Sequence, residues 1–359
     1  MTVSRIRVDG ERAYQVVIGT GVLGELPALV GPSARTVVVV HPRGLGEVAR
    51  PVCGVLTDAG YAVRGEEVPA GESAKTVGVA ADLWSRLAVH RLTRSDAIVG
   101  VGGGATTDLA GFVAATWLRG VRLVLVPTTL LAVVDAAVGG KTAVNIEAGK
   151  NLVGAFHPPA GVLTDLAALE SLPTAEYVSG LAEVIKAGFI ADPRILDLIE
   201  ADPAGAVVPH GRHARELVER AVRMKAGVVA ADLREAGRRE MLNYGHTLGH
   251  AIERVERYQI RHGEAIAIGM VYAAELARLA GRLDTPTVDR HRRVLAAVGL
   301  PTSFLPGVWP ALREAMSVDK KSRGARMRFV VLDGPARPAI LDDPPEDLMA
   351  RAYGEVASR

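Results

Sequence analysis

The feature that most constrains the fold is a change of pattern part-way along the chain. In the first half, short runs rich in β-branched residues alternate with helical stretches such as Lys75–Leu92. Strands are predicted over residues 14–19, 36–40, 61–68, 97–101 and 122–127. This alternation is typical of βαβ units, in which helices cover a mostly parallel sheet. The first half is therefore predicted to form an α/β domain.

After about Pro173 helical periodicity replaces this alternation, and Gly and Pro separate the segments. Helices are predicted over residues 175–190, 212–231, 240–258, 262–282 and 287–299, with one late strand in the segment RMRFVVLDG. We therefore expect an N-terminal α/β domain with a mostly parallel sheet over residues 1–170, followed by an α-helical domain over residues 171–359.

Composition and charge exclude several classes of function. The 42 basic residues nearly balance the 40 acidic ones, so no general attraction to nucleic acid or membrane is expected. The longest uncharged stretch, Asn151–Thr164, is too short to span a membrane, and the N-terminus carries charges where a signal peptide needs an apolar run. A single cysteine, Cys53, excludes an internal disulfide framework. We expect a soluble cytoplasmic protein that acts on a small molecule.

A glycine-rich turn marks a candidate nucleotide site. In AIVGVGGGATTDLAGF, Gly102, Gly103 and Gly104 follow a predicted strand and precede a helix expected to begin near Thr106. Glycines at the end of a strand let the backbone approach a phosphate closely, and the helix N-terminus presents free N–H groups to it. Tight packing of the helix on the strand is the alternative explanation. The carboxylate of Asp108 in the first turn interacts favourably with the helix dipole whether or not a ligand binds.

The segment from Val126 to Pro159 combines polar groups with an apolar background. Its GGKT sequence is not a P-loop, because the P-loop pattern requires glycine at the position of Asp135. Lysines in such apolar surroundings are costly unless they face an anion, so they are expected to line a binding site. The polar residues are Thr128, Thr129, Asp135, Lys141, Lys150 and Asn151.

Histidines in the second half suggest a metal site. In NYGHTLGH, His246 and His250 are four residues apart on one helix face, but the glutamate of the HExxH motif is missing. A carboxylate and two imidazoles form a common ligand set for zinc, and Glu183 in GLAEVIKAG can supply the carboxylate. Alternatively, Glu183 forms only a helix ion pair with Lys186. The spacing does not decide which two of His246, His250 and His262 would bind.

Taken together, eight segments resemble the 3-dehydroquinate synthase family of the shikimate pathway. They occur in the family's order over roughly residues 70 to 330: GESAK, GGGATTD, LVPTTLLAVVDAAVGGKTAVN, GKNLVGAFHPP, GLAEVIKAG, LNYGHTLGHAIE, RHGEAIAIGM and the late DKK. The resemblance implies an NAD-binding α/β domain, a helical metal-binding domain, an active site between them and a homodimer.

The resemblance also implies roles for individual residues. The expected metal ligands are Glu183, His246 and His262, holding Zn²⁺ or Co²⁺. Expected contacts to NAD⁺ are Glu72, Lys75, Gly103, Gly104, Ala105, Thr106, Thr107, Asp108, Thr128, Thr129, Asp135, Lys141, Lys150 and Ser171. Expected contacts to substrate are Lys141, Asn151, Lys186, Lys225, Arg239, Asn243, His250, one of Lys320 and Lys321, and Arg119 reaching across the dimer.

Two positions depart from the family pattern. His41 follows a predicted strand where relatives commonly carry a shorter polar or acidic residue for ribose, so it is left out of the predicted site. Thr107 stands where many relatives have glycine, which affects the expected geometry of the glycine turn.

The implied reaction converts 3-deoxy-D-arabino-heptulosonate 7-phosphate to 3-dehydroquinate and phosphate. Transient oxidation at C5 by NAD⁺ acidifies the neighbouring C6–H and lets phosphate leave, and the returned hydride leaves no net redox change. The metal acts as a Lewis acid at the oxidised alcohol. Alternatives are another sugar phosphate cyclase, such as an amino-dehydroquinate synthase, a metal-dependent alcohol or glycerol dehydrogenase, and a noncatalytic binding protein on the same scaffold.

Overall fold

The computed structural model describes residues 3–234, 237–323 and 326–357, without the side chains of residues 318–323. The chain divides into two compact units. The first contains Met1–Leu172 and Lys225–Arg234, and the second contains Pro173–Met224 and Glu235–Arg359. Helix α8 (Ala214–Ala231) therefore begins in the second unit and ends in the first.

The first unit is built on a seven-stranded sheet with the order β1-β2-β9-β6-β5-β3-β4. Its strands are parallel except for the antiparallel β1–β2 pair, which confirms the predicted mostly parallel sheet. The strands are β1 (Ser4–Val8), β2 (Tyr14–Gly19), β3 (Thr36–Pro42), β4 (Ala62–Val68), β5 (Ala97–Gly102), β6 (Arg122–Pro127) and β9 (Gly161–Asp165).

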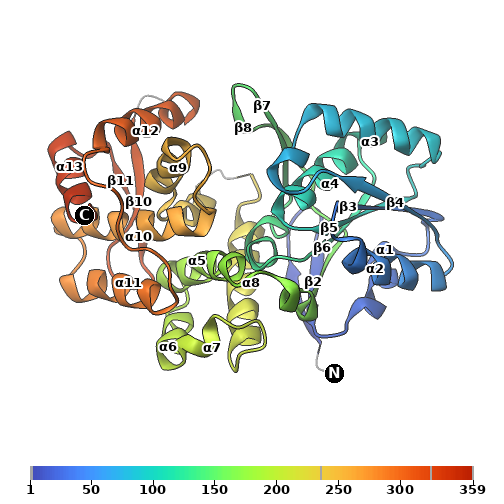
Figure 1. Cartoon of the computed structure of the whole chain (residues 1–359), viewed down its shortest axis with the longest axis horizontal. Coiled ribbons are helices and arrows are strands. Elements are labelled where there is room, and N and C mark those ends of the chain that lie inside the picture. The colour runs from blue at the N-terminus through green and yellow to red at the C-terminus, as the bar shows by residue number, and fades with distance from the viewer. Residues whose placement is uncertain (1–2, 235–236, 324–325, 358–359) are drawn as a thin grey trace. The chain divides into compact units, whose positions relative to one another are not determined.

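Helices cover both faces of this sheet, as Figure 1 shows for α1 and α2 on one face and α3 and α4 on the other. The continuous valine run Val37–Val40 in β3 is fully buried, as expected for a central parallel strand. Apolar side chains of α1 and α2 join alternate residues of the central strands in one core cluster. The helices are α1 (Leu26–Val30), α2 (Gly46–Asp58), α3 (Val77–Val89) and α4 (Gly104–Thr116).

The order of strands places a switch point between β3 and β5. The chain passes from β3 outward to β4 and then returns to form β5 on the other side of β3. In open α/β sheets, ligands bind beyond the carboxyl ends of the strands at such a point. The glycine turn follows β5, so the topology places it at this switch point.

A hairpin of β7 (Lys141–Ile146) and β8 (Gly149–Phe156) lies outside the main sheet and was not predicted. It packs against α4 at Gly111, where an added Cβ would lie 2.3 Å from Cγ2 of Thr142. Short helices complete the unit: η1 (Leu23–Glu25), η2 (Gly71–Ala74), η3 (Trp117–Arg119), the π-helix η4 (Ala132–Ala136) and η5 (Leu166–Ser171).

The second unit is mainly helical and is built around α10 (His262–Leu279), most of whose residues are buried. Helix α10 packs against α5, α9, α11, α13 and β10. The other elements are α5 (Thr174–Ile190), α6 (Arg194–Ala201), α7 (Pro203–Ala206), η6 (Arg238–Asn243), α9 (His246–Val255), α11 (Thr285–Ala297), α12 (Trp309–Arg323), β10 (Arg328–Leu332), β11 (Pro338–Asp342) and α13 (Glu346–Gly354).

One predicted helix is wrong. Residues 240–258 do not form a continuous helix, because η6 ends at Asn243 and α9 begins only at His246. Gly245 separates them with a left-handed φ of 81°. At the other end, Arg257 and Tyr258 also have positive φ, so α9 stops at Val255. His246 therefore stands at the start of its helix, and Asn243 lies on a different element.

Glycines let α10 approach its neighbours at backbone distance. An added Cβ on Gly263 would lie 1.8 Å from the carbonyl oxygen of Ser179 in α5. On Gly269 it would lie 1.9 Å from the carbonyl oxygen of Gly245, just before α9. Real Cβ atoms do not approach oxygen so closely, so only glycine fits at these two positions. The two contacts join the helices that carry Glu183, His246 and His262.

We predict that Gly269→Ala lowers the free energy of unfolding by about 3 kcal/mol or more, because the methyl group forces α10 away from Gly245. Gly227→Ala is the matched control, since Gly227 is an exposed position of α8 and no atom lies within 4 Å of the added Cβ. That change should be neutral or stabilise by up to about 1 kcal/mol. Urea denaturation of both variants measures the difference, and equal stabilities would contradict the close contact.

Candidate metal centre and cofactor site

Glu183, His246 and His262 come together in the second unit from three different helices. One ligand atom from each lies within 4.8 Å of the other two. The Nε2 atoms of His246 and His262 lie 3.5 Å and 3.7 Å from Oε1 of Glu183. This Oε1 atom is buried and has no hydrogen-bond partner among the described residues.

A buried carboxylate oxygen without a partner is costly unless another group satisfies it. Here the oxygen faces two imidazole nitrogens, and a carboxylate with two imidazoles is a standard set of protein ligands for catalytic zinc. The three residues therefore fit a divalent cation. The donor set leaves room for a substrate or water ligand, as catalytic metal sites require.

The second oxygen of Glu183 is held by Lys186, one turn further along α5. The two form the predicted helix ion pair, and both side chains are buried. Burial acts to raise the pKa of Glu183, but the charge of Lys186 outweighs it and holds the pKa well below its usual range. Glu183 is therefore a charged carboxylate that is oriented by one oxygen and open at the other.

The two histidines differ in their electrostatic surroundings. Burial, aided by the charge of Lys186, lowers the pKa of His246 well below its usual range, which leaves a lone pair available. Burial also lowers the pKa of His262, but the carboxylates of Glu183 and Glu253 outweigh it and raise this pKa to about 10. Without a metal, the two carboxylates therefore favour the protonated, positively charged form of His262.

His250 lies beside this group rather than facing Glu183. Its ring centroid is 5.1 Å from that of His246 and 6.2 Å from that of His262. His250 is exposed and belongs, with Glu253 and His262, to a second possible ligand group. The tertiary structure thus brings all three histidines together, and two of them direct Nε2 at Glu183. That the metal ligands are Glu183, His246 and His262 remains a prediction, which this geometry supports.

In the first unit the glycine turn adopts the expected strand–turn–helix form. Helix α4 begins at Gly104, two residues earlier than expected, with Gly103 as its N-cap. Added Cβ atoms on Gly103 and Gly104 would lie 3.2 Å from Thr129 and 3.3 Å from Ala136, so the turn touches both following segments. Thr128 donates its backbone N–H to the carbonyl of Gly102.

Other residues near the turn are mainly buried. Ala105 is half-buried, and Thr106 and Thr107 are buried. The Thr107 hydroxyl donates to the carbonyl of Gly104, so this departure from the family pattern is accommodated within the helix. His41 is buried at the end of β3, and its neighbour Pro42 lies 3.2 Å from the Cβ position of Gly102.

Lys75 is buried at the centre of a polar network. Its Nζ donates to Oδ2 of Asp108 at 2.7 Å and to Oδ1 of Asn151 at 2.5 Å. Asn145 completes the network by donating to Glu72 and accepting from the backbone N–H of Asn151. Burial raises the pKa of Asp108 to about 6 even though Lys75 opposes the shift. The network ties the GESAK segment to both α4 and the β7–β8 hairpin.

A second buried lysine meets the predicted nicotinamide residue. Lys225 in α8 donates to the backbone oxygen and to the side chain of Asp135, and both residues belong to the first unit. Lys225 was predicted to contact substrate and Asp135 to contact NAD⁺. Their ion pair therefore links a predicted substrate contact to a predicted NAD⁺ contact.

The remaining predicted residues lie in varied surroundings. Arg119 and Lys141 are exposed, Lys150 and Asn243 are half-buried, and Arg239 is buried on η6. Ser171 ends η5, where its hydroxyl donates to the carbonyl of Ala168. Lys320 and Lys321 belong to α12, but their side chains lie outside the described part of the structure.

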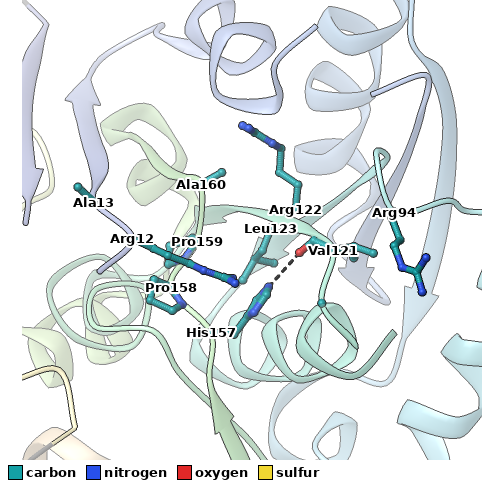
Figure 2. A pocket seen from close by; sticks show the side chains of 11 residues that line it. Arg12, Ala13, Arg94, Val121, Arg122, Leu123, His157, Pro158, Pro159 and Ala160 are labelled. Atoms are coloured by element: carbon teal, nitrogen blue, oxygen red, sulfur yellow. Dashed lines mark hydrogen bonds between the residues drawn. The ribbon is translucent and has the colours of Figure 1, made fainter. Parts of the chain in front are cut away.

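A cavity of about 250 Å³ in the first unit contains none of the predicted site residues. Figure 2 shows that Arg94 and Arg122 on its lining point away from each other. Arg122 donates to the carbonyl of Leu29, and His157 donates from Nε2 to the carbonyl of Val121. Arg94 and Arg122 therefore do not converge on a common point of this cavity.

Comparisons with known proteins bear on both units. Models of the N-terminal and C-terminal parts of 3-dehydroquinate synthase match residues 66–179 and 180–322. The chain is 66% identical over 358 residues to a 3-dehydroquinate synthase of Thermobifida fusca, covering 99% of this chain and 97% of that one. The chain belongs to the 3-dehydroquinate synthase family.

Other members of the family and solved structures extend the comparison. A Streptomyces avermitilis 3-dehydroquinate synthase is 60% identical, covering 99% of this chain and 98% of that one. A 2-deoxy-scyllo-inosose synthase complexed with carbaglucose-6-phosphate, NAD⁺ and Co²⁺ is 27% identical with a TM-score of 0.88, covering 99% and 100% of the two chains. The 2-epi-5-epi-valiolone synthase ValA from Streptomyces hygroscopicus, with NAD⁺ and Zn²⁺ bound, is 26% identical with the same TM-score, covering 99% of both chains.

Sequence reasoning missed two polar residues of these clusters. Glu253 follows His246 by seven residues on α9, and its carboxylate lies 3.4 Å from Nδ1 of His262. That seven-residue spacing on a helix face was a usable signal. No sequence signal marked Asn145, which bridges Glu72 and Asn151, because its contacts join segments far apart in the sequence.

We predict that His262→Ala abolishes stoichiometric Zn²⁺ binding, because it removes one of two imidazoles facing Glu183. His250→Ala should retain the metal, since the three facing atoms remain. Metal content after gel filtration in Zn²⁺-containing buffer measures both, with circular dichroism as a check on folding. Equal loss of metal in the two variants would contradict the assignment of His262, rather than His250, as a metal ligand.

Proposed function

We propose that the protein is a 3-dehydroquinate synthase that converts 3-deoxy-D-arabino-heptulosonate 7-phosphate to 3-dehydroquinate and phosphate. The observation that carries the proposal is the 66% identity to a 3-dehydroquinate synthase over almost the whole of both chains. The arrangement of Glu183, His246 and His262 supports it, because this reaction requires a Lewis acid at a hydroxyl group.

NAD⁺ and one divalent metal, Zn²⁺ or Co²⁺, are the proposed cofactors. NAD⁺ supplies transient oxidation of the substrate alcohol, and the metal supplies Lewis acid catalysis at that alcohol. The switch-point position of the glycine turn, with its helix N-terminus, supports the pyrophosphate end of NAD⁺ there. The unpartnered Oε1 of Glu183 supports the metal.

The protein's own side chains orient these groups and bind the anionic substrate. Lys186 fixes the Glu183 carboxylate through one oxygen, and Lys225 fixes Asp135. Lys75 holds Asp108 and Asn151, so the helix that follows the glycine turn and the hairpin keep a defined separation. We assign the binding of the substrate's carboxylate and phosphate to Lys141 and Arg239, whose positive charges strengthen hydrogen bonds to anions, and to Asn243 and His250, whose side-chain N–H groups can donate to them.

Two alternative enzymes share parts of this architecture. Other sugar phosphate cyclases match at only 26–27% identity, well below the named 3-dehydroquinate synthases. A protein of Sinorhizobium meliloti described as a probable glycerol dehydrogenase matches with a TM-score of 0.61 at 20% identity, and this likeness concerns the fold alone. We therefore retain the cyclase proposal with the heptulosonate phosphate as substrate.

The proposal is tested by incubating Zn²⁺-loaded protein with the heptulosonate phosphate and a catalytic amount of NAD⁺. Phosphate and 3-dehydroquinate should appear in equal amounts, with no accumulation of NADH, because the hydride returns to the substrate. Glu183→Gln serves as the inactive control. NADH accumulation without phosphate would indicate a dehydrogenase, and absence of both would contradict the proposal.

We also propose a cytoplasmic homodimer in which Arg119 serves the partner's active site. In the described part of the chain, no helix is long and apolar enough to cross a membrane. Leu118 and Arg119 have positive φ values of 51° and 68°, and their turn carries the Arg119 side chain outward in an exposed position. Such backbone strain in non-glycine residues often accompanies function.

This assignment predicts complementation between inactive variants. Arg119→Ala and Glu183→Gln should each be nearly inactive, whereas mixed dimers formed by refolding them together should regain up to about one quarter of wild-type activity. That fraction follows if half the dimers are mixed and each contains one intact site. Mixing each variant with itself is the control. No recovery, with mixed dimers demonstrated by mass spectrometry, would place Arg119 in its own subunit's site.

A further inference from the structure

Glu253 is a half-buried carboxylate that the proposed metal ligands do not include. It lies on α9 two turns after His246, and only 14% of its side chain is exposed. Its Oε1 lies 3.4 Å from Nδ1 of His262, the first residue of α10. The contact is held by the packing of α9 on α10, where an added Cβ on Gly249 would lie 2.7 Å from Ile266.

The two nitrogens of His262 face different carboxylates. Nε2 faces Oε1 of Glu183 at 3.7 Å, and Nδ1 faces Glu253. A neutral imidazole carries its proton on one nitrogen and a lone pair on the other. A proton on Nδ1 that is donated to Glu253 leaves the lone pair of Nε2 directed at the space beside Glu183.

His246 is held in the same way by a different acceptor. Its Nδ1 lies 3.1 Å from the carbonyl oxygen of Tyr244, while its Nε2 faces Glu183. The Tyr244 hydroxyl in turn donates to Nε2 of His291 at 2.8 Å, and both side chains are fully buried. Both histidines therefore have Nδ1 engaged and Nε2 directed at the same unpartnered oxygen.

We propose that Glu253 is a positioning residue that fixes the orientation and tautomer of His262 for metal binding. The proposal rests on the proposed metal site. Partners of this kind hold the ring in place and increase the basicity of the ligand, and their loss typically lowers metal affinity about 10–100-fold. Glu253 acts through His262 and makes no contact with the metal itself.

A competing assignment makes Glu253 a ligand of a second cation, together with His250 and His262. A cation at each nitrogen of His262 would require the imidazole to lose both protons. That cost disfavours two cations sharing this ring. The two assignments predict different metal stoichiometries, which makes them separable by experiment.

The test uses the full chain with Zn²⁺ or Co²⁺ alone and no substrate, so it does not depend on turnover. Zn²⁺ affinity is measured by competition with a chelator, and the Co²⁺ absorption spectrum reports the geometry around the metal. Glu253→Ala should bind one metal about 10–100-fold more weakly than wild type and shift the Co²⁺ bands. Glu253→Gln should recover much of the affinity, because its side-chain oxygen still accepts from Nδ1–H.

Glu256→Ala, at the residue that caps the end of α9, is the matched control, since the described residues give the Glu256 side chain no hydrogen bond or ion pair. It should keep wild-type affinity and an unchanged spectrum. Circular dichroism spectra without metal, unchanged among the variants, separate positioning from a loss of folding. Unchanged affinity in folded Glu253→Ala would overturn the proposal, as would a wild type that binds two cations and loses one in this variant. If wild type binds one metal but releases no phosphate in the activity assay, the proposed reaction is contradicted and the positioning role of Glu253 is not.

Discussion

The close contact of α10 with α5 and with the turn before α9 is the constraint on which the metal centre depends. Each of these elements contributes one ligand-type side chain, and ligands separated by many residues can meet only if their helices approach closely. Gly263 and Gly269 allow that approach because their missing side chains leave room for carbonyl oxygens of the neighbouring elements. The same contact places the left-handed Gly245 immediately before His246, so that this ligand begins its helix.

Electrostatics in the second unit are organised around one buried carboxylate. Glu183 is kept charged by Lys186, and it has one oxygen unpartnered in the direction of two imidazoles. A buried negative charge of this kind favours any cation that fits between the donors, whether a metal ion or the proton on His262. The surrounding acceptors, Tyr244 and Glu253, direct the imidazole rings toward it. Affinity for a metal therefore depends on residues beyond the three that face the ion.

The first unit uses buried lysines in a comparable way. Lys75 and Lys225 each join segments that the sequence separates widely, and each pairs with a carboxylate that was predicted to contact NAD⁺. Such pairs are costly to bury, and removing one partner leaves a charge without compensation. They fix the separation of α4, the hairpin and the segment containing Asp135. The switch-point turn thereby has a defined frame on which a ligand can bind.

The sequence by itself determined the class of each half, because strand alternation, valine-rich runs and helical periodicity are local consequences of burial. It also identified Glu183 and the histidines as ligand types, and its motifs identified the family. Tertiary structure decided what local pattern cannot express. Periodicity alone predicted a continuous helix over residues 240–258, whereas Gly245 breaks it under the approach of α10. Spacing alone left the three histidines equivalent as candidate ligands. Packing directs Nε2 of His246 and of His262 at Glu183, and it brings Glu253 to His262. Local sequence cannot express this, because side-chain orientation depends on contacts between distant segments.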